Sequence, residues 1–325
     1  MIKRKIMRKL IVTSSILFAF ILVYFIPKDK ELKNVKEELE YNYKDVVKET
    51  IYLLDNNNYL GKAEIALSTN DTVTMVRELL ETLITDGIGE DKIPNGFTSI
   101  IPSDTKINSI ELDKGILKVD FSKELLDVKK ELEEKVIESI IYTVTEVKEI
   151  DKVVIFVDGK ILTKLPKSNI NLPTTLDRSF GINKKYDITT FKDITPVTIY
   201  YINKHNNNNT YYVPVTKYIN DDREKIEIII DELTTSPIYT SNLMSYLNSN
   251  TKLLKSNIDK DLMSLEFNDY IFNDYEDKKI LEEVIYTISL SIYDNYNVRE
   301  VSFINDSKEV YTSSYVDNDL VINYK

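Results

Sequence analysis

Hydrophobic residues fall into one long run, broken only by Thr13, Ser14 and Ser15, followed by two stretches in which strand-like and helix-like patterns alternate. The run, Leu10–Ile26, would form a helix about 25 Å long, close to the roughly 30 Å hydrocarbon core of a bilayer. Basic residues precede it and no acidic residue interrupts it: Lys3, Arg4, Lys5, Arg8 and Lys9. Because basic flanks stay in the cytoplasm, this pattern predicts a single-pass cell-membrane anchor with the N-terminus inside and everything after Pro27 outside.

Three interpretations of this segment stay open: an uncleaved anchor, a cleaved signal peptide and a buried core helix. A cleaved signal peptide needs small residues after its apolar core, whereas this run ends in the bulky sequence Val-Tyr-Phe-Ile. The bulky end favours an uncleaved signal anchor over residues 1–27. Residues 28–47 are rich in Lys and Glu and are expected to form a stalk.

After the stalk, the spacing of apolar positions changes repeatedly between a period of two and a period near 3.6. It predicts strands at 49–55 and 63–68, a helix starting after the N-cap Asp71, a hairpin of 107–112 with 116–121, a helix at 128–147 and a strand at 153–157. The last strand is apolar at every position, which indicates a strand covered on both faces.

The second stretch repeats the first. Three blocks match in the same order: Thr105–Phe121 with Thr251–Phe267 at an offset of 146, Glu138–Thr143 with Glu282–Thr287 at 144, and Val153–Lys160 with Val301–Lys308 at 148. In the second stretch Asp221 is the expected helix N-cap, since Glu224 follows at the spacing of a capping box. Ordered matches with small gap changes indicate duplication.

The expected domain organisation follows from the duplication. It consists of an anchor (1–27), a stalk (28–47), a first domain (48–162), a linker (163–195), a second domain (196–312) and a C-terminal tail (313–325). The linker contains prolines and no periodic stripe, so we expect it to pack partly between the domains. In each unit, two amphipathic helices need an apolar face to cover, and a mixed β-sheet supplies one. The fold class is therefore α+β, in two tandem copies.

The amino-acid composition excludes several classes of function. The chain of 325 residues has no cysteine, which excludes disulfides, thiolate catalysis, Cys-based zinc sites and attachment as a lipoprotein. Its net charge is −11, and the anchor itself is basic, so the rest of the chain is more acidic still. An acidic surface repels phosphate backbones, and no nucleic-acid partner is expected.

No residue cluster indicates catalysis, a cofactor or a metal. The single histidine, His205, lies among asparagines and is expected in a solvated loop. Asp113 and Asp158 are interpreted as turn formers, since Asp bonds to nearby backbone and tolerates turn geometry. Tyrosine is abundant, with 22 residues, and favours interfaces because its ring buries area while its hydroxyl bonds. The candidate partner surface consists of Tyr200, Tyr201, Tyr211 and Tyr212.

Several segments resemble the sporulation and germination family called GerM, whose module is called GerMN. The first unit carries Ile101–Ile107, Val119–Ser122, Tyr142–Thr145 and Val153–Gly159, and the second carries Val197–Tyr201, Leu265–Asn268, Tyr286–Ser289 and Val301–Ser307. The second unit departs from the pattern at Leu247–Asn248, which replaces Ile-Pro, and at Ser307, which replaces Gly. The missing cysteine is a further departure, because family members are often lipoproteins.

The resemblance implies a fold like the ring-building motif of a sporulation envelope channel and a non-enzymatic role in spore envelope assembly or germination. It implies partners among other envelope or sporulation proteins, with self-association left open. The alternative is a cell-wall module that binds peptidoglycan or another carbohydrate, although the chain lacks tryptophan, the strongest sugar platform.

Overall fold

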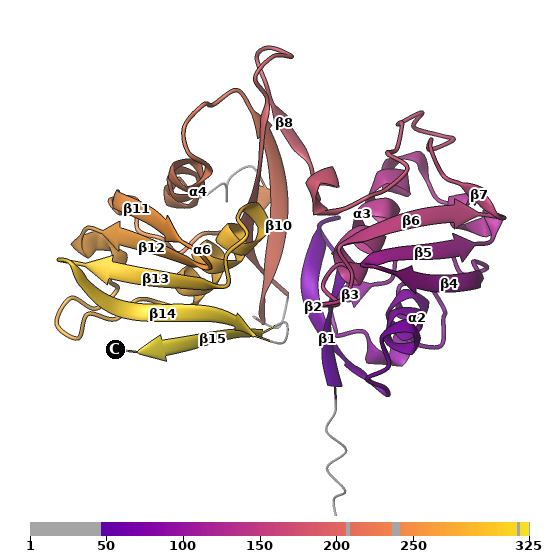
Figure 1. Ribbon diagram of the computed structural model, residues 1–325, viewed down its shortest axis with the longest axis horizontal. Coiled ribbons are helices and arrows are strands. Elements are labelled where there is room, and N and C mark those ends of the chain that lie inside the picture. The colour runs from indigo at the N-terminus through magenta and orange to yellow at the C-terminus, as the bar shows by residue number, and fades with distance from the viewer. Residues whose placement is uncertain (1–46, 206–208, 236–240, 317–318, 325) are drawn as a thin grey trace, which may run out of the picture. The chain divides into compact units, whose positions relative to one another are not determined.

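The two halves of the chain fold through nearly the same succession of elements (Figure 1). The computed structural model describes residues 47–205, 209–235, 241–316 and 319–324, and residues 46–325 form one compact unit. The first half contains β1 (Val47–Asp55), β2 (Leu60–Leu67), α2 (Thr72–Thr82), β3 (Phe97–Thr98), β4 (Ile107–Asp113), β5 (Ile116–Phe121), α3 (Glu133–Val144), β6 (Lys152–Val157) and β7 (Lys160–Ile161).

The second half repeats this order among its described residues, apart from β3, which it lacks, and a last strand, which it adds. It contains β9 (Thr195–Lys204), β10 (Thr210–Ile219), α4 (Lys225–Thr234), β11 (Leu253–Asp259), β12 (Leu262–Phe267), α6 (Glu282–Asn295), β13 (Glu300–Asn305), β14 (Lys308–Val316) and β15 (Asp319–Tyr324). Short 3₁₀ turns lie at Glu90–Lys92, Lys123–Leu126, Lys130–Leu132, Arg178–Phe180 and Asp269–Ile271, and the connecting segment adds β8 (Lys185–Asp187).

Three sheets organise these strands. The first half has the sheet β4-β5-β6-β7 and the second has β11-β12-β13-β14-β15. β5 and β6 run parallel, as do β12 and β13, so α3 and α6 serve as crossover helices. The third sheet, in the order β3-β1-β2-β10-β8 with β9 paired to β10, joins the N-terminal hairpins of both halves.

The arrangement differs from the expectation that all strands of a unit form one sheet under its helices. α3 packs against both β1 and β6, and α4 packs against both β9 and β11. Each hairpin therefore covers the helices on the side opposite the main sheet. The hairpin places an apolar face on the helices, and its edge strand β2 meets β10 of the second half at one residue pair.

The predicted hairpin of 107–112 with 116–121 is confirmed, with the connection at Lys114-Gly115. Both turn residues have positive φ, 49° and 78°, the combination of a two-residue turn that matches strand twist. Asp158-Gly159 forms the same kind of turn, at φ 48° and 75°, which confirms Asp158 as a turn former. The strand at 153–157 is confirmed as covered on both faces from Val153 to Ile155, which are all buried.

The helix boundaries are partly as predicted. Asp71 caps α2, because its side chain accepts a hydrogen bond from the Thr74 N–H at 3.0 Å. Asp221 does not cap α4, which begins at Lys225, because its carboxylate instead binds the backbone N–H and guanidinium of Arg223. The α-helix expected at 128–147 is shorter, since a 3₁₀ turn precedes it at Lys130–Leu132.

The connecting segment is packed, and the C-terminal residues belong to a sheet. Leu165, Leu172 and Leu176 are buried, and Leu176 exchanges backbone hydrogen bonds with Val153 of β6. Of the residues expected as a tail, 313–316 form the end of β14 and 319–324 form the edge strand β15. Within the described residues no helix is long and apolar enough to cross a membrane. The expected anchor, Leu10–Ile26, lies outside them.

Candidate functional site: the junction between the repeats

Equivalent residues of the two repeats meet at the junction. Thr50-Ile51-Tyr52 in β1 recurs as Thr198-Ile199-Tyr200 in β9, 148 residues later. The hydroxyls of Tyr52 and Tyr200 lie 3.1 Å apart. The backbone N–H groups of these two tyrosines bind residues that are also 148 positions apart. The Tyr52 N–H donates to Thr143 Oγ1 at 3.0 Å, and the Tyr200 N–H donates to Ser291 Oγ at 2.9 Å.

One further contact obeys this relation and another lies two residues from it. Asp55 and Asn203 are also 148 residues apart, and the Asn203 amide donates to Asp55 Oδ2 at 3.0 Å. Lys62 of β2 pairs with Tyr212 of β10 in an antiparallel register, at a separation of 150. Contact between a residue and its own equivalent is the signature of a two-fold axis. The repeats therefore associate as a symmetric dimer would, within one chain.

Arg178, in the connecting segment, adds contacts to this junction that do not follow the two-fold relation. Its Nε donates to Asp294 Oδ1 at 2.5 Å and its Nη1 to Glu146 Oε1 at 3.2 Å. Its Nη2 donates to the hydroxyls of Tyr52 and Tyr200 at 3.2 and 3.1 Å. One guanidinium thus binds groups from both repeats, and its planar fork suits several acceptors at once.

The donor and the acceptor can be assigned in each hydrogen bond between the tyrosine hydroxyls and Glu146. Tyr52 donates to Glu146 Oε1 at 2.6 Å, so Tyr200 is the donor in the tyrosine pair. Tyr315 of β14 donates to the other carboxylate oxygen of Glu146 at 2.8 Å, and Lys62 Nζ donates to Tyr315 at 3.1 Å. Glu146 therefore accepts bonds from both repeats and from the connecting segment.

Charges around Glu146 control its ionisation. Burial alone raises the pKa of this carboxyl, but Lys62, Arg178 and the hydrogen bonds from Tyr52 and Tyr315 outweigh burial and lower the pKa to about 2. Burial likewise favours the neutral form of Arg178, yet Asp294 and the other acceptors hold its pKa well above the usual value. Both groups are charged at neutral pH. The two cations Lys62 and Arg178 face the two anions Glu146 and Asp294.

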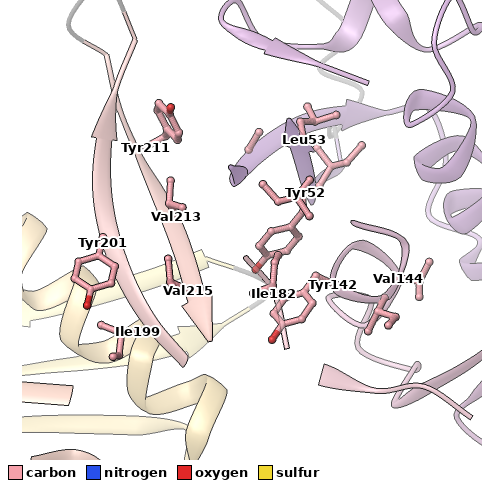
Figure 2. Packing of buried hydrophobic residues seen from close by; sticks show 14 of the residues in the cluster. Tyr52, Leu53, Tyr142, Val144, Ile182, Ile199, Tyr201, Tyr211, Val213 and Val215 are labelled. Atoms are coloured by element: carbon pink, nitrogen blue, oxygen red, sulfur yellow. The ribbon is translucent and has the colours of Figure 1, made fainter. Parts of the chain in front are cut away.

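The Arg178 side chain also rests on aromatic rings. Its guanidinium lies 4.3 Å from the ring centre of Tyr142, which packs edge-on against Tyr52 at 5.4 Å. Figure 2 shows Tyr52 and Tyr142 next to Ile182 of the connecting segment. The rings and the acceptors together fix the orientation of the guanidinium.

Asn183 joins the two hairpins. Its amide nitrogen donates to Leu60 O of β2 and to Pro214 O of β10, both at 2.8 Å. Its side-chain oxygen accepts from the Leu60 N–H at 2.9 Å, and its own N–H donates to Glu138 Oε2 at 2.9 Å. Burial raises the pKa of Glu138 to about 7, against the opposing charges of Lys135 and Lys184. The connecting segment thus bonds to both sides of the junction.

The four tyrosines singled out from the sequence do not form an exposed partner surface. Tyr200, Tyr201 and Tyr211 are 2%, 1% and 7% exposed, and Tyr212 is half-buried. Tyr211 donates to Asp55 of the first repeat at 2.6 Å, whereas Tyr201 donates to Glu232 of its own repeat at 3.2 Å. Two of the four, Tyr200 and Tyr211, bond across the junction, so their partner is the other repeat.

His205 is not in a solvated loop. Its ring stacks on Tyr211 at 4.1 Å and meets Phe97 of β3 edge-on at 4.6 Å. Burial lowers the pKa of the imidazole, partly opposed by the charge of Asp55. The polar residues around His205 gave no sign of this packing, because one of its two ring partners, Phe97, lies more than a hundred residues away in the sequence.

Sequence reasoning did not find Arg178, Tyr52, Glu146, Asp294 or Asn183. One signal was present: the recurrence of Thr-Ile-Tyr at a separation of 148 marks Tyr52 as the equivalent of Tyr200. Nothing comparable marks Arg178 or Asn183, which lie in a segment without periodicity. Among the residues described by the structure, no group of three or more acidic or histidine side chains could hold a metal ion.

The fold and the junction define a class: proteins with two tandem α+β repeats, joined by a network of buried hydrogen bonds and charges. The sequence matches the model of the family described as "Germane: Sporulation and spore germination" at residues 23–163 and 198–311. It is 32% identical over 268 residues to the spore germination protein GerM of Bacillus subtilis (strain 168), across 80% of this chain and 72% of that protein.

A solved structure gives the same result. The tandem GerMN domains of the sporulation protein GerM from Bacillus subtilis superpose with a TM-score of 0.74 at 31% identity, covering 81% of this chain and 92% of that one. The chain belongs to the Germane family, with tandem GerMN domains. The relationship supports a role in sporulation or spore germination.

Proposed function

We propose that this protein is a non-enzymatic scaffold of the bacterial envelope that acts in spore envelope assembly or germination. In this proposal Leu10–Ile26 is an uncleaved transmembrane anchor, and the tandem repeats lie outside the cell membrane. Its partners are other envelope or sporulation proteins, and self-association is a second mode. The family relationship supports the biological setting.

One observation carries the non-enzymatic part of the proposal. The polar groups gathered at the junction bind one another: Arg178 is committed to two carboxylates and two tyrosines, and both oxygens of Glu146 accept tyrosine hydroxyls. A catalytic acid or base needs access to a substrate proton. Glu146, Arg178 and Tyr200 line a cavity of about 1090 Å³, but there they bind one another and Tyr52. These bonds hold the two repeats in one orientation, which suits a rigid spacer or an assembly component.

Membrane topology is tested by cysteine labelling, and only the introduced cysteine can react because the chain has no cysteine of its own. Lys255 is exposed on β11, and Lys5 lies before the anchor. In intact cells, a membrane-impermeant maleimide should label the Lys255→Cys variant and leave the Lys5→Cys variant unlabelled until the membrane is permeabilised. Equal labelling of both variants would contradict the anchor.

The scaffold role is tested by crosslinking the full-length protein in sporulating cells and purifying it through a tag. Co-purification with envelope proteins is expected, and it should be lost for a variant that lacks the anchor. A separate assay incubates the full-length protein with peptidoglycan sacculi and measures released muropeptides. No release is expected. If the unaltered protein released more muropeptide than the Glu146→Gln and Arg178→Lys variants, the junction would be an enzyme site.

A further inference from the structure

A second feature lies where β2 meets β10. A cavity of about 400 Å³ opens there, with walls from both repeats. Its volume falls in the range of small-molecule sites, roughly 300–1,000 Å³. It lies beside the Lys62–Tyr212 strand pair, and the Arg178 guanidinium is not part of its wall.

Aromatic rings form much of the cavity wall, and their positions are fixed. Tyr212 and Tyr286 stack with their planes 7° apart and their centres separated by 5.3 Å. Tyr211 packs against His205 and against Phe97, and its hydroxyl is anchored by Asp55. Rings held in this way offer flat apolar faces without a large cost of ordering on binding.

The polar groups of the cavity are varied and balanced in charge. Lys62 and Glu64 contribute one charge of each sign, and Asn95 and Thr210 contribute an amide and a hydroxyl. His205 lines the cavity, and its Nε2 is buried without a hydrogen-bond partner in the described part of the chain. A buried nitrogen without a partner costs free energy, so a ligand that draws the imidazole toward the cavity and bonds to this nitrogen would remove that cost.

We propose that this cavity binds one or two rings of a neutral, N-acetylated saccharide, of the N-acetylglucosamine type. The apolar face of a pyranose ring stacks on a tyrosine, and its hydroxyls suit amide, hydroxyl and imidazole partners. Pro94 and Leu290 in the same wall suit an acetyl methyl group. The balanced charge disfavours phosphates and nucleotides. This inference goes beyond the scaffold role and does not require it.

The test titrates the full-length protein, in detergent, with N-acetylglucosamine and its β-1,4-linked dimer and trimer. Saturation-transfer NMR and calorimetry measure binding, and inorganic phosphate is the charged control probe. We expect saturable binding with a Kd of about 1 mM or tighter for the dimer, and none for phosphate. The His205→Ala and Tyr212→Ala variants should each weaken binding at least tenfold, and Tyr275→Ala, which alters an exposed ring outside the cavity, should not.

Unfolding is monitored for each variant, because Tyr212 also contributes to the junction. If Tyr212→Ala fails to fold, the His205→Ala variant and the unaltered protein decide the outcome. The proposal is overturned if the folded protein binds none of the three saccharides, if phosphate binds in their place, or if His205→Ala binds them as tightly as the unaltered protein. None of these results would change the membrane labelling or crosslinking that tests the scaffold role.

Discussion

At the scale of single residues, Glu146 contributes most clearly to the junction. Its side chain is 5% exposed and accepts three hydrogen bonds, from Tyr52, Arg178 and Tyr315. We predict that Glu146→Gln lowers the free energy of unfolding by about 3 kcal/mol, because it leaves Arg178 and Lys62 with one fewer compensating charge. Chemical denaturation at pH 7 measures the difference. Glu149→Gln, an exposed change three residues away, should alter stability by less than about 0.5 kcal/mol.

The same residue predicts a dependence on pH. The pKa of Glu146 falls from its usual 4.5 to about 2 in the folded protein, so its contribution is complete above pH 4.5 and is lost as the pH falls toward 2. The difference in stability between the unaltered protein and Glu146→Gln should shrink across that window. A difference that stays constant down to pH 2.5 would show that the carboxylate charge is not the source of the effect.

Ser307 and Gly159 occupy equivalent turns with different residues. Ser307 has φ 60° and Gly159 has φ 75°, in the left-handed region that favours glycine. Their N–H groups make the same contact: Gly159 donates to Asp120 Oδ1 at 3.0 Å and Ser307 to Glu266 Oε1 at 3.1 Å. We predict that Ser307→Gly stabilises the protein by about 0.5 kcal/mol and that Gly159→Ser destabilises it by about 1 kcal/mol, in thermal or chemical unfolding.

The Ser307→Gly and Gly159→Ser variants serve as controls for each other. A Cβ at Gly159 would meet no atom within 4 Å, so any loss there comes from backbone conformation and not from a clash. Changes of the same sign in both variants would contradict an account based on positive φ.

At the scale of elements, two aspartates expected to begin helices behave differently. Asp71 caps α2 through the Thr74 N–H, whereas Asp221 binds Arg223 outside α4. Asp71→Ala should therefore lower the melting temperature by about 2 °C, since an uncompensated helix N-terminus loses a hydrogen bond. Asp221→Ala should change it by less than half as much. Differential scanning calorimetry measures both, and an equal loss in the two variants would contradict this assignment.

The crossover helices show what sequence matching predicted correctly and what it left undetermined. Sequence matching aligns Glu138–Thr143 with Glu282–Thr287 at an offset of 144. The contacts of Tyr52 and Tyr200 instead pair Thr143 with Ser291, at 148. The two offsets differ by four residues, about one helical turn, which leaves the same face of the helix buried. Periodicity therefore predicted the buried face of each helix and left its register along the axis undetermined.

At the scale of the whole molecule, the connecting segment fixes the pairing of the repeats. The symmetric contacts alone are few: the tyrosine pair, Asp55 with Asn203, and a single residue pair between β2 and β10. Arg178 and Asn183 supply bonds to both repeats from a segment of the same chain. A covalent tether raises the effective concentration of these groups, so a small interface suffices.

This arrangement predicts how Arg178 controls the pairing. Spin labels on the Glu111→Cys and Lys255→Cys positions, exposed on β4 and β11, report the distance between the main sheets of the two repeats. Pulsed electron resonance should give one narrow distance distribution for the double-cysteine protein. Arg178→Ala should broaden it, because Glu146 and Asp294 then lose their shared cation. Arg178→Lys, which keeps the charge without the planar fork, should give an intermediate width. An unchanged distribution in Arg178→Ala would contradict a clamping role.

The sequence by itself determined the duplication, the α+β class, the hairpin of 107–112 with 116–121, the buried strand at 153–157 and the N-cap of α2. Each of these depends on local burial and turn chemistry, which alternation, helical spacing and residues such as Asp71 and Gly115 express within a few positions. The family resemblance extended the same local signals to both repeats.

Only the tertiary structure decided which buried groups meet. Tyr200 and Tyr211 lie under the other repeat, His205 packs on Phe97, and Arg178 joins carboxylates from both halves. A polar side chain can be buried when its partners converge from distant segments, and no short pattern encodes that convergence. Two of the four clustered tyrosines, Tyr200 and Tyr211, therefore bond to the other repeat, because a tyrosine pattern is the same whether its partner is another protein or the other half of the chain.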